Sequence, residues 1–200
     1  MKNLSLKNFL STFLSDYWGY VSVFEKHNTN LVESQNWDLK SVGNNKSSLT
    51  ADLSGNSIVF SPTIVDDSND FWFIKDESGN YVPQKQLVTT LYQEMQADFS
   101  DNFSFKGQIE SNTLKTRYDI PYTISAFVAA YYKVPQYPGN LILIHEVFSE
   151  VNTLGNFDIQ MDVSSFTDIT HVQWGFKMSG YPVYPTESGN QGCVTITNSI

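Results

Sequence analysis

The chain has 200 residues, a formal net charge of −9, an aromatic content of 14% and a single cysteine, Cys193. This length suits one domain with a proper core, and the acidic balance argues against binding nucleic-acid backbones or anionic membranes, which requires clustered Lys and Arg. One cysteine excludes an internal disulfide. We expect a single domain over residues 1–200, with 1–19 as a helical arm or lid and 20–200 as a β-sandwich.

The first predicted element is an amphipathic helix over Leu6–Trp18. Its apolar residues recur at the i, i+3, i+4, i+7 spacing of one helical face, Ser5 can cap its start, and Gly19 can end it. Polar residues interrupt the stretch, so it has neither the apolar core of a signal peptide nor the length of a membrane span. Two roles are open for this helix: an arm that docks on a partner subunit, or a lid over one open end of the sandwich.

Short strands separated by turn residues follow the helix. Ser54-Gly55-Asn56 and Glu77-Ser78-Gly79-Asn80 have the composition of tight turns. The spacing of four between Leu87, Leu91 and Met95 predicts one short helix, Gln84–Ala97, inserted between strands. The strands predicted in this half are Val21–Phe24, Leu31–Leu39, Leu49–Leu53, Ile58–Pro62 and Phe71–Ile74.

The second half contains the clearest strand pattern. In Phe157–Val163 and in Val172–Met178 every second side chain is large and apolar, whereas those between are polar or glycine. A period of two with one apolar face is typical of a half-buried strand, and successive strands of this kind favour an antiparallel sandwich. Trp174 belongs to an apolar stripe, so we expect it in the core. The other strands predicted here are Phe103–Glu110, Tyr118–Tyr132, Leu141–Phe148 and Cys193–Thr197.

Residues with catalytic or metal-binding chemistry are sparse. The three histidines, His27, His145 and His171, lie far apart, and no nucleotide-binding, zinc or serine-nucleophile motif is present. Asp158 and Asp162 would be about 13 Å apart on a strand, which is too far for the carboxylate pair of a glycosidase. We therefore expect no enzyme activity, no metal and no cofactor.

Two groups of polar residues can each be interpreted in two ways. Asp162 would lie opposite His145 if the turn Asn152–Gly155 sets the register, either as an acid–base couple or as a polar surface pair. The aspartates of the Asp66–Asp70 loop suit either a calcium site or a solvated loop. Cys193, between Gly192 and Val194, is expected to be a buried and inert thiol.

The aromatic side chains favour sugar binding. A flat exposed ring can stack on a sugar while amides, carboxylates and cations nearby bond its hydroxyls. Several aromatic residues lie in or beside predicted loops, although packing is the alternative for each one. The candidate ligand-binding residues are Tyr131, His145, Asp158, Gln160, His171, Gln173 and Lys177, with Trp72 and Tyr137 at the rim.

Five segments follow one another along the chain: Asn30-Leu31 with Asn36-Trp37, YTISAFVAAYY at Tyr122–Tyr132, FDIQMDV at Phe157–Val163, V-x-W-G-F at Val172–Phe176 and G-x-V-T-I-T-N at Gly192–Asn198. In this order, from about Asn30 to Ile200, the chain resembles the jelly-roll carbohydrate-binding modules that accompany glycan-degrading enzymes and occur in phage tail proteins. The resemblance implies an all-β jelly-roll sandwich and non-catalytic glycan binding. It does not extend to the N-terminal helix or to Gln84–Ala97, and Asn198 stands alone where many such modules have aspartates that help to hold a structural calcium.

These features together predict a non-catalytic protein that binds a polysaccharide or cell-surface glycan, with the N-terminal helix as the site for a protein partner. A phage virion component that adheres to host glycans would need neither a secretion signal nor disulfides, because it folds in a reducing cytoplasm and is released by lysis. We expect it in the virion or outside the cell. The alternatives are a structural or assembly protein of a particle without glycan binding, a cytoplasmic β-sandwich, and a glycoside hydrolase or lyase.

Overall fold

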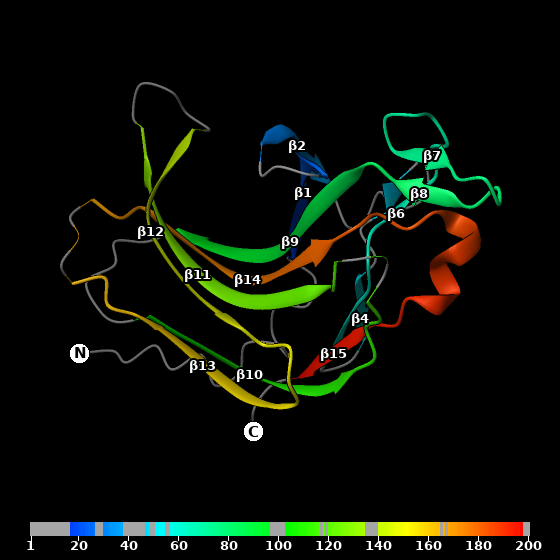
Figure 1. The fold of residues 1–200 in the computed structure, drawn as a ribbon. Coiled ribbons are helices and arrows are strands. Elements are labelled where there is room, and N and C mark those ends of the chain that lie inside the picture. Colours follow the sequence, from blue (N-terminus) through cyan, green and yellow to red (C-terminus); the bar gives the residue numbers. More distant parts are fainter. Residues whose placement is uncertain are drawn as a thin grey trace.

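A computed structural model describes residues 17–26, 30–37, 47–48, 51–54, 57–96, 103–116, 118, 120–134, 140–164, 166 and 168–197. Within them the chain forms two antiparallel sheets and two short ribbons (Figure 1). The six-stranded sheet contains, in spatial order, β12 (Leu141–Glu150), β11 (Thr123–Lys133), β14 (His171–Gly180), β9 (Lys85–Gln96), β1 (Trp18–Glu25) and β2 (Leu31–Trp37). The five-stranded sheet contains β13 (Gly155–Met161), β10 (Phe103–Asn112), β15 (Val194–Thr197), β5 (Ser57–Phe60) and β4 (Ala51–Ser54). The ribbons pair β3 (Ser47–Ser48) with β6 (Ile64–Val65) and β7 (Phe73–Lys75) with β8 (Tyr81–Pro83), and a 3-10 helix, η2 (Pro185–Asn190), precedes β15.

The core lies between the inner faces of the two sheets. Trp174 and Phe176 on β14 are 3% and 1% exposed, as the alternation of that strand predicts. From the other sheet, Phe103 packs on Trp174 and Phe105 packs on Phe176, with ring centroids 5.1 and 5.3 Å apart. Aromatic pairs at such separations add to the stabilisation that comes from apolar burial. The predictions of an all-β sandwich and of a buried Trp174 are confirmed.

The prediction of a helix over Gln84–Ala97 is wrong, because this segment forms the 12-residue strand β9. Leu87, Leu91 and Met95 do share one face, but a spacing of four is also a multiple of the strand period of two. The strand lies in the middle of the six-stranded sheet, between β14 and β1. The hydrophobic spacing alone therefore did not distinguish the two structures.

Two polar residues on the inner side of β9 concealed the alternation. Thr89 and Gln93 are each 2% exposed, and both have partners inside the sandwich. Thr89 Oγ1 lies 2.5 Å from Thr63 Oγ1, and Gln93 Oε1 accepts a hydrogen bond from Trp174 Nε1 at 3.3 Å. Buried polar groups are tolerated when they are hydrogen-bonded in this way.

The predicted N-terminal helix falls mostly on residues 1–16, outside the described part of the chain, and its predicted end is not helical. β1 begins at Trp18, and Tyr17 before it is 4% exposed within the core. Gly19, which was expected to end the helix, pairs with Leu91 in the sheet. Whether an arm or a lid precedes β1 stays a prediction.

The turn after β12 carries the chain from one sheet to the other. β12 pairs with β11 and β13 pairs with β10, so Asp162 does not lie opposite His145, which instead pairs with Ala130. Asn152 holds this crossing in place, since its Oδ1 accepts a hydrogen bond from the backbone N–H of Ile124 at 2.8 Å. The register predicted for His145 and Asp162 is therefore wrong.

The six-stranded sheet is strongly curved (Figure 1). β11, β14 and β9 bow so that their outer face is concave, and the β11–β12 and β1–β2 strand pairs rise on either side of it. The five-stranded sheet lies on the convex side and closes the core, while β7, β8 and η2 lie together at one end of the sandwich.

Candidate functional site

The outer face of the six-stranded sheet gathers polar and aromatic side chains. Because β14 alternates, its residues His171, Gln173 and Lys177 point away from the core. His171 is nevertheless 4% exposed and Gln173 7% exposed, which is low for an outward-facing polar residue. We call this surface the tyrosine face; its members are Tyr20, Tyr92, Glu94, Tyr131, Glu146, His171, Gln173 and Lys177.

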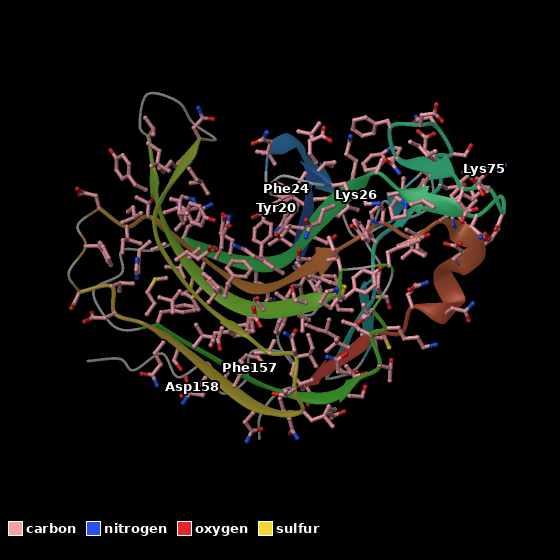
Figure 2. The ribbon with its side chains drawn as sticks, viewed as in Figure 1. Tyr20, Phe24, Lys26, Lys75, Phe157 and Asp158 are labelled. Carbon is pink, nitrogen blue, oxygen red and sulfur yellow. The ribbon has the colours of Figure 1, made fainter. Side chains whose placement is uncertain are left out.

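Three tyrosines on three strands give the surface its name. Tyr20 of β1 and Tyr92 of β9 meet edge to face, with ring centroids 5.9 Å apart. Tyr131 lies on β11, across β14 from β9. All three rings are half-buried. Figure 2 shows Tyr20 and Phe24 on β1 above β9, on the concave side of the sheet.

The electrostatic environment of Tyr131 shows which groups surround its hydroxyl. Burial raises the pKa of the Tyr131 phenol well above its ordinary value, and Tyr20, Glu146, Tyr92 and Glu94 each raise it further. Such interactions weaken with distance, so these groups lie around one phenol. Tyr131 is therefore neutral at ordinary pH, and a neutral phenol can both donate and accept a hydrogen bond.

A carboxylate, an amide and an imidazole form one polar cluster on this face. Gln173 Nε2 donates a hydrogen bond to Glu94 Oε2 at 2.7 Å, and His171 Nε2 lies 3.9 Å from Glu94 Oε1. On its other side, His171 Nδ1 lies 2.9 Å from Thr170 Oγ1. The Glu94 side chain retains 23% exposure. Since a carboxylate can accept about four hydrogen bonds, Glu94 has capacity left for the hydroxyls of a ligand.

A second cluster is built around Lys177. Its ammonium contacts Glu146 Oε1 and lies 4.7 Å from the centroid of the Phe127 ring. The Lys177 and Glu146 side chains are 25% and 23% exposed, and Phe127 is 1% exposed. An ion pair combined with a cation–π contact holds a flexible lysine in one place. The positive charge of Lys177 is thus compensated within the face.

Glycine at position 175 lets β14 approach β9 closely beneath these side chains. Gly175 pairs with Tyr92 on one side and with Phe127 on the other. A Cβ atom at this position would lie 2.0 Å from the carbonyl oxygen of Leu91 and 2.8 Å from Tyr92 Cα. The close approach fixes Tyr92 relative to the strand that carries Gln173 and Lys177.

The structure brings four of the predicted ligand residues together on the tyrosine face, namely Tyr131, His171, Gln173 and Lys177. Asp158 and Gln160 lie instead on β13, in the other sheet. The alternation predicted a polar face for each strand, but it contained no information on which strands share a sheet.

Asp158 and Gln160 belong to a separate and exposed patch. Asp158 accepts hydrogen bonds from Lys106 Nζ at 2.6 Å, Ser104 Oγ at 3.1 Å and Gln160 Nε2 at 3.1 Å. Burial raises the pKa of Asp158, but these hydrogen bonds outweigh it and hold the pKa below its ordinary value. In Figure 2, Asp158 and Phe157 lie on β13, on the opposite side of the sandwich from Tyr20. The patch is therefore separated from the tyrosine face by the core.

The remaining predicted residues lie elsewhere. His145 on β12 pairs with Ala130, whose side faces the core, and its ring stacks on Phe166 with centroids 5.1 Å apart. Trp72 is half-buried next to β7 and meets Phe71 edge to face at 4.9 Å. Tyr137 lies outside the described residues. Neither His145 nor Trp72 is part of the tyrosine face.

Four members of the face were missed from the sequence: Tyr20, Tyr92, Glu94 and Glu146. Tyr92 and Glu94 lie within the segment predicted as a helix, and in a helix alternate residues do not point to opposite faces. In a strand they have the parity opposite to Leu91, and this would have placed both outside the core. Glu146 was concealed by an irregularity in β12: Ala130 pairs with His145 and Tyr131 with Leu143, so the alternation of β12 shifts at Ile144.

The other polar features do not form sites in the described residues. Asp67 in the Asp66–Asp70 loop accepts hydrogen bonds from the backbone and the side chain of Asn69, so it shapes the loop. Across the described residues, no three His, Cys, Asp or Glu side chains lie close enough to hold a metal ion. Cys193 is half-buried and lies directly before β15, so the prediction of a buried thiol is wrong. No helix in the described part of the chain is long and apolar enough to cross a membrane.

Comparison with known proteins gives structural likenesses. The sequence matches no protein family and no curated protein. Among solved structures, the fold is similar to one from the work "Structural basis for the promiscuous specificity of the carbohydrate-binding modules from the beta-sandwich super family". The match covers 90% of this chain and 81% of that chain, with 8% sequence identity and a TM-score of 0.32. A TM-score this low supports no inference, so function is inferred from the tyrosine face alone.

Proposed function

We propose that the protein binds carbohydrate on the tyrosine face and does not turn it over. One observation supports the proposal most strongly: one concave surface carries three tyrosine rings, two carboxylates, the amide of Gln173 and the imidazole of His171. Aromatic rings stack on the apolar faces of sugars, and the polar groups bond the hydroxyls at their edges. The curved sheet suits an extended chain of sugars better than a single one, because it presents these groups along several strands.

The non-catalytic part of the proposal rests on the contacts of the two carboxylates. Glu146 is engaged by the Lys177 ammonium, and Glu94 is engaged by the Gln173 amide. A glycosidase needs one carboxyl group that donates a proton and a second that attacks or activates water. We expect no release of reducing ends from any glycan that binds.

The order of the strands supports assignment to the jelly-roll class. One sheet contains β5-β15-β10-β13 and the other contains β9-β14-β11-β12, and the chain passes repeatedly between the two. We assign these eight strands to a jelly roll, in which two interlocked Greek keys form the two sheets. β1, β2 and β4 extend the sheets at their edges.

A glycan array followed by calorimetry with the best ligand tests the proposal. Replacement of Tyr20 or Tyr92 by alanine is expected to weaken binding about fivefold to tenfold each, because each loses a stacking surface. Tyr118→Ala is the control, since Tyr118 is 44% exposed and its hydroxyl bonds the Tyr81 carbonyl on β8, away from this face. Failure of the wild-type chain to bind any bacterial or plant glycan at millimolar sensitivity would refute the proposal.

We further propose that the protein is part of a virion and helps it to adhere to glycans on the host cell. If the protein is displayed in many copies on a virion, weak single sites would combine into an avidity gain of roughly 10²–10⁴. The expected location is then the virion or the outside of the cell. Purified protein should bind host cells and compete with particle adsorption; absence of both effects would leave glycan binding standing without the adhesion role.

A structural or assembly role is the second candidate, and the edge of the six-stranded sheet favours it. β12 is an edge strand with several large apolar side chains exposed, including Ile142 at 54%, Leu143 at 50% and Phe148 at 63%. Long apolar edge strands tend to pair with other chains. Light scattering of the wild type and of Phe148→Ser tests this role: a monomer in both cases disfavours it.

A further inference from the structure

The charges on the tyrosine face do not balance. Glu94 and Glu146 contribute two negative charges, and Lys177 contributes one positive charge that is already paired with Glu146. Glu94 bonds a neutral amide, and the His171 ring is 3.9 Å from it. The charges of Glu94, Glu146 and Lys177 therefore sum to −1, and the uncompensated negative charge lies at the half-buried Glu94 carboxylate.

Charged residues around the tyrosine face do not make its net charge positive. At the two ends of the β11–β12 strand pair, Lys133 and Glu150 carry one charge of each sign. Lys26 lies at the far end of the sheet from Glu94: its ammonium is 5.4 Å from the centroid of the Tyr181 ring, which follows the last residue of β14, whereas Glu94 pairs with Gln173 near the start of β14. The whole chain adds a background of −9. An approaching anion is thus repelled at long range as well as at the face.

We infer that the tyrosine face selects uncharged polysaccharides and rejects those that carry carboxylate or sulfate groups; the inference rests on the proposed function. A hydroxyl donates a hydrogen bond to Glu94, whereas a uronate or sulfate brings a second negative charge beside it. Because Glu94 and Glu146 are less than a quarter exposed, solvent and salt screen that repulsion only in part. A repulsive group placed in this way discriminates between ligands of the same shape.

Matched polymers separate this inference from simple glycan binding. Affinity electrophoresis of the full chain would use methyl-esterified against de-esterified polygalacturonate, hydroxyethyl cellulose against carboxymethyl cellulose, and unsulfated against sulfated galactan. For every pair in which either polymer is bound, the wild type is expected to bind the neutral polymer about tenfold more tightly. Raising the salt concentration should narrow this ratio, because it screens the repulsion.

Two isosteric variants and one matched control locate the effect. E94Q keeps an acceptor oxygen for Gln173. It should reduce the ratio of the affinities for the neutral and the anionic polymer about threefold to tenfold. E146Q removes the other carboxylate charge, leaves Lys177 uncompensated and should act in the same direction, which covers failure of E94Q to fold. Asp158→Asn changes the net charge by the same amount on the outer side of the other sheet and should leave the ratio unchanged.

Each outcome decides the inference. Anionic polymers bound as tightly as neutral ones, or a ratio that falls equally in Asp158→Asn and E94Q, would overturn it while leaving the proposed function intact. Binding of no polymer of either kind, together with binding of no glycan on the array, would overturn both the inference and the proposed function. Preferential binding of neutral polymers that E94Q or E146Q relaxes, and Asp158→Asn does not, supports it.

Discussion

Two adjacent threonines on β9 have opposite hydrogen-bonding environments. Thr89 points inward, and its hydroxyl pairs with that of Thr63. Thr90 lies on the outer face, is 1% exposed, and its hydroxyl has no hydrogen-bond partner in the described structure. A buried hydroxyl without a partner keeps the cost of its lost hydration, whereas a paired hydroxyl recovers it.

Replacing each threonine by valine should therefore have opposite effects on stability. Thr90→Val is expected to leave the free energy of unfolding unchanged or to raise it by about 1–2 kcal/mol, since it removes an unpaired polar group. Thr89→Val should lower it by about 1–3 kcal/mol, because Thr63 then loses its partner. Urea denaturation of both variants measures the difference. An equal loss in both would mean that the Thr90 hydroxyl is hydrogen-bonded in solution.

At the scale of the element, the strands differ in how well the sequence predicts them. β13 and β14 have apolar residues at every second position, and both were predicted correctly in type and in buried face. β9 was predicted as a helix, because its core side includes Thr89 and Gln93 and its apolar residues remain at a spacing of four. Strands with a fully apolar inner face are thus recognisable, and a strand whose inner face binds buried polar partners is not.

The candidate site was predictable only in part, for a related reason. Alternation along β14 placed His171, Gln173 and Lys177 on a polar face, which is where they are. The same reasoning grouped Asp158 with them, although β13 belongs to the opposite sheet. Parity is a property of one strand, whereas the arrangement of strands into sheets depends on pairings between residues distant in the sequence.

Pairing of β14 with β9 depends on glycine at one position, and its replacement provides an element-scale test. Gly175→Ala is expected to lower the free energy of unfolding by about 3 kcal/mol or more, since its Cβ would overlap the Leu91 carbonyl oxygen and the strands would have to separate. Gly189→Ala is the control, because a Cβ there meets nothing within 4 Å. Equal midpoints of thermal unfolding in both variants would contradict the close approach seen here.

At the scale of the whole molecule, stability should depend on alkaline pH through its tyrosines. Burial raises the pKa values of the Tyr17, Tyr92 and Tyr131 phenols above their ordinary value. The folded chain therefore favours the neutral phenols. Their contribution to stability is complete below the unfolded pKa of about 10 and is lost as the pH rises through the folded values.

We accordingly expect the free energy of unfolding to be nearly constant from about pH 8 to 9 and to fall above about pH 10. Tyr131→Phe removes one ionisable group and should make the fall shallower. Urea titrations across this range, together with tyrosinate absorbance of the folded chain, measure both effects. Ionisation of every tyrosine at the ordinary pH without loss of structure would be inconsistent with the buried phenols.

The position of β15 affects how the chain folds after synthesis. This strand lies inside the five-stranded sheet, where it pairs with β10 on one side and with β5 on the other, although it is the last described strand in the sequence. Until Val194–Thr197 has left the ribosome, the β4–β5 and β10–β13 pairs share no ladder, and both would expose unpaired edges. The five-stranded sheet is therefore completed only after every residue from β4 to the end of β15 has been made. Pairings between such distant segments close slowly, on the scale of milliseconds to seconds for β-sandwiches, and in that interval the nascent chain is most exposed to aggregation and most dependent on chaperones.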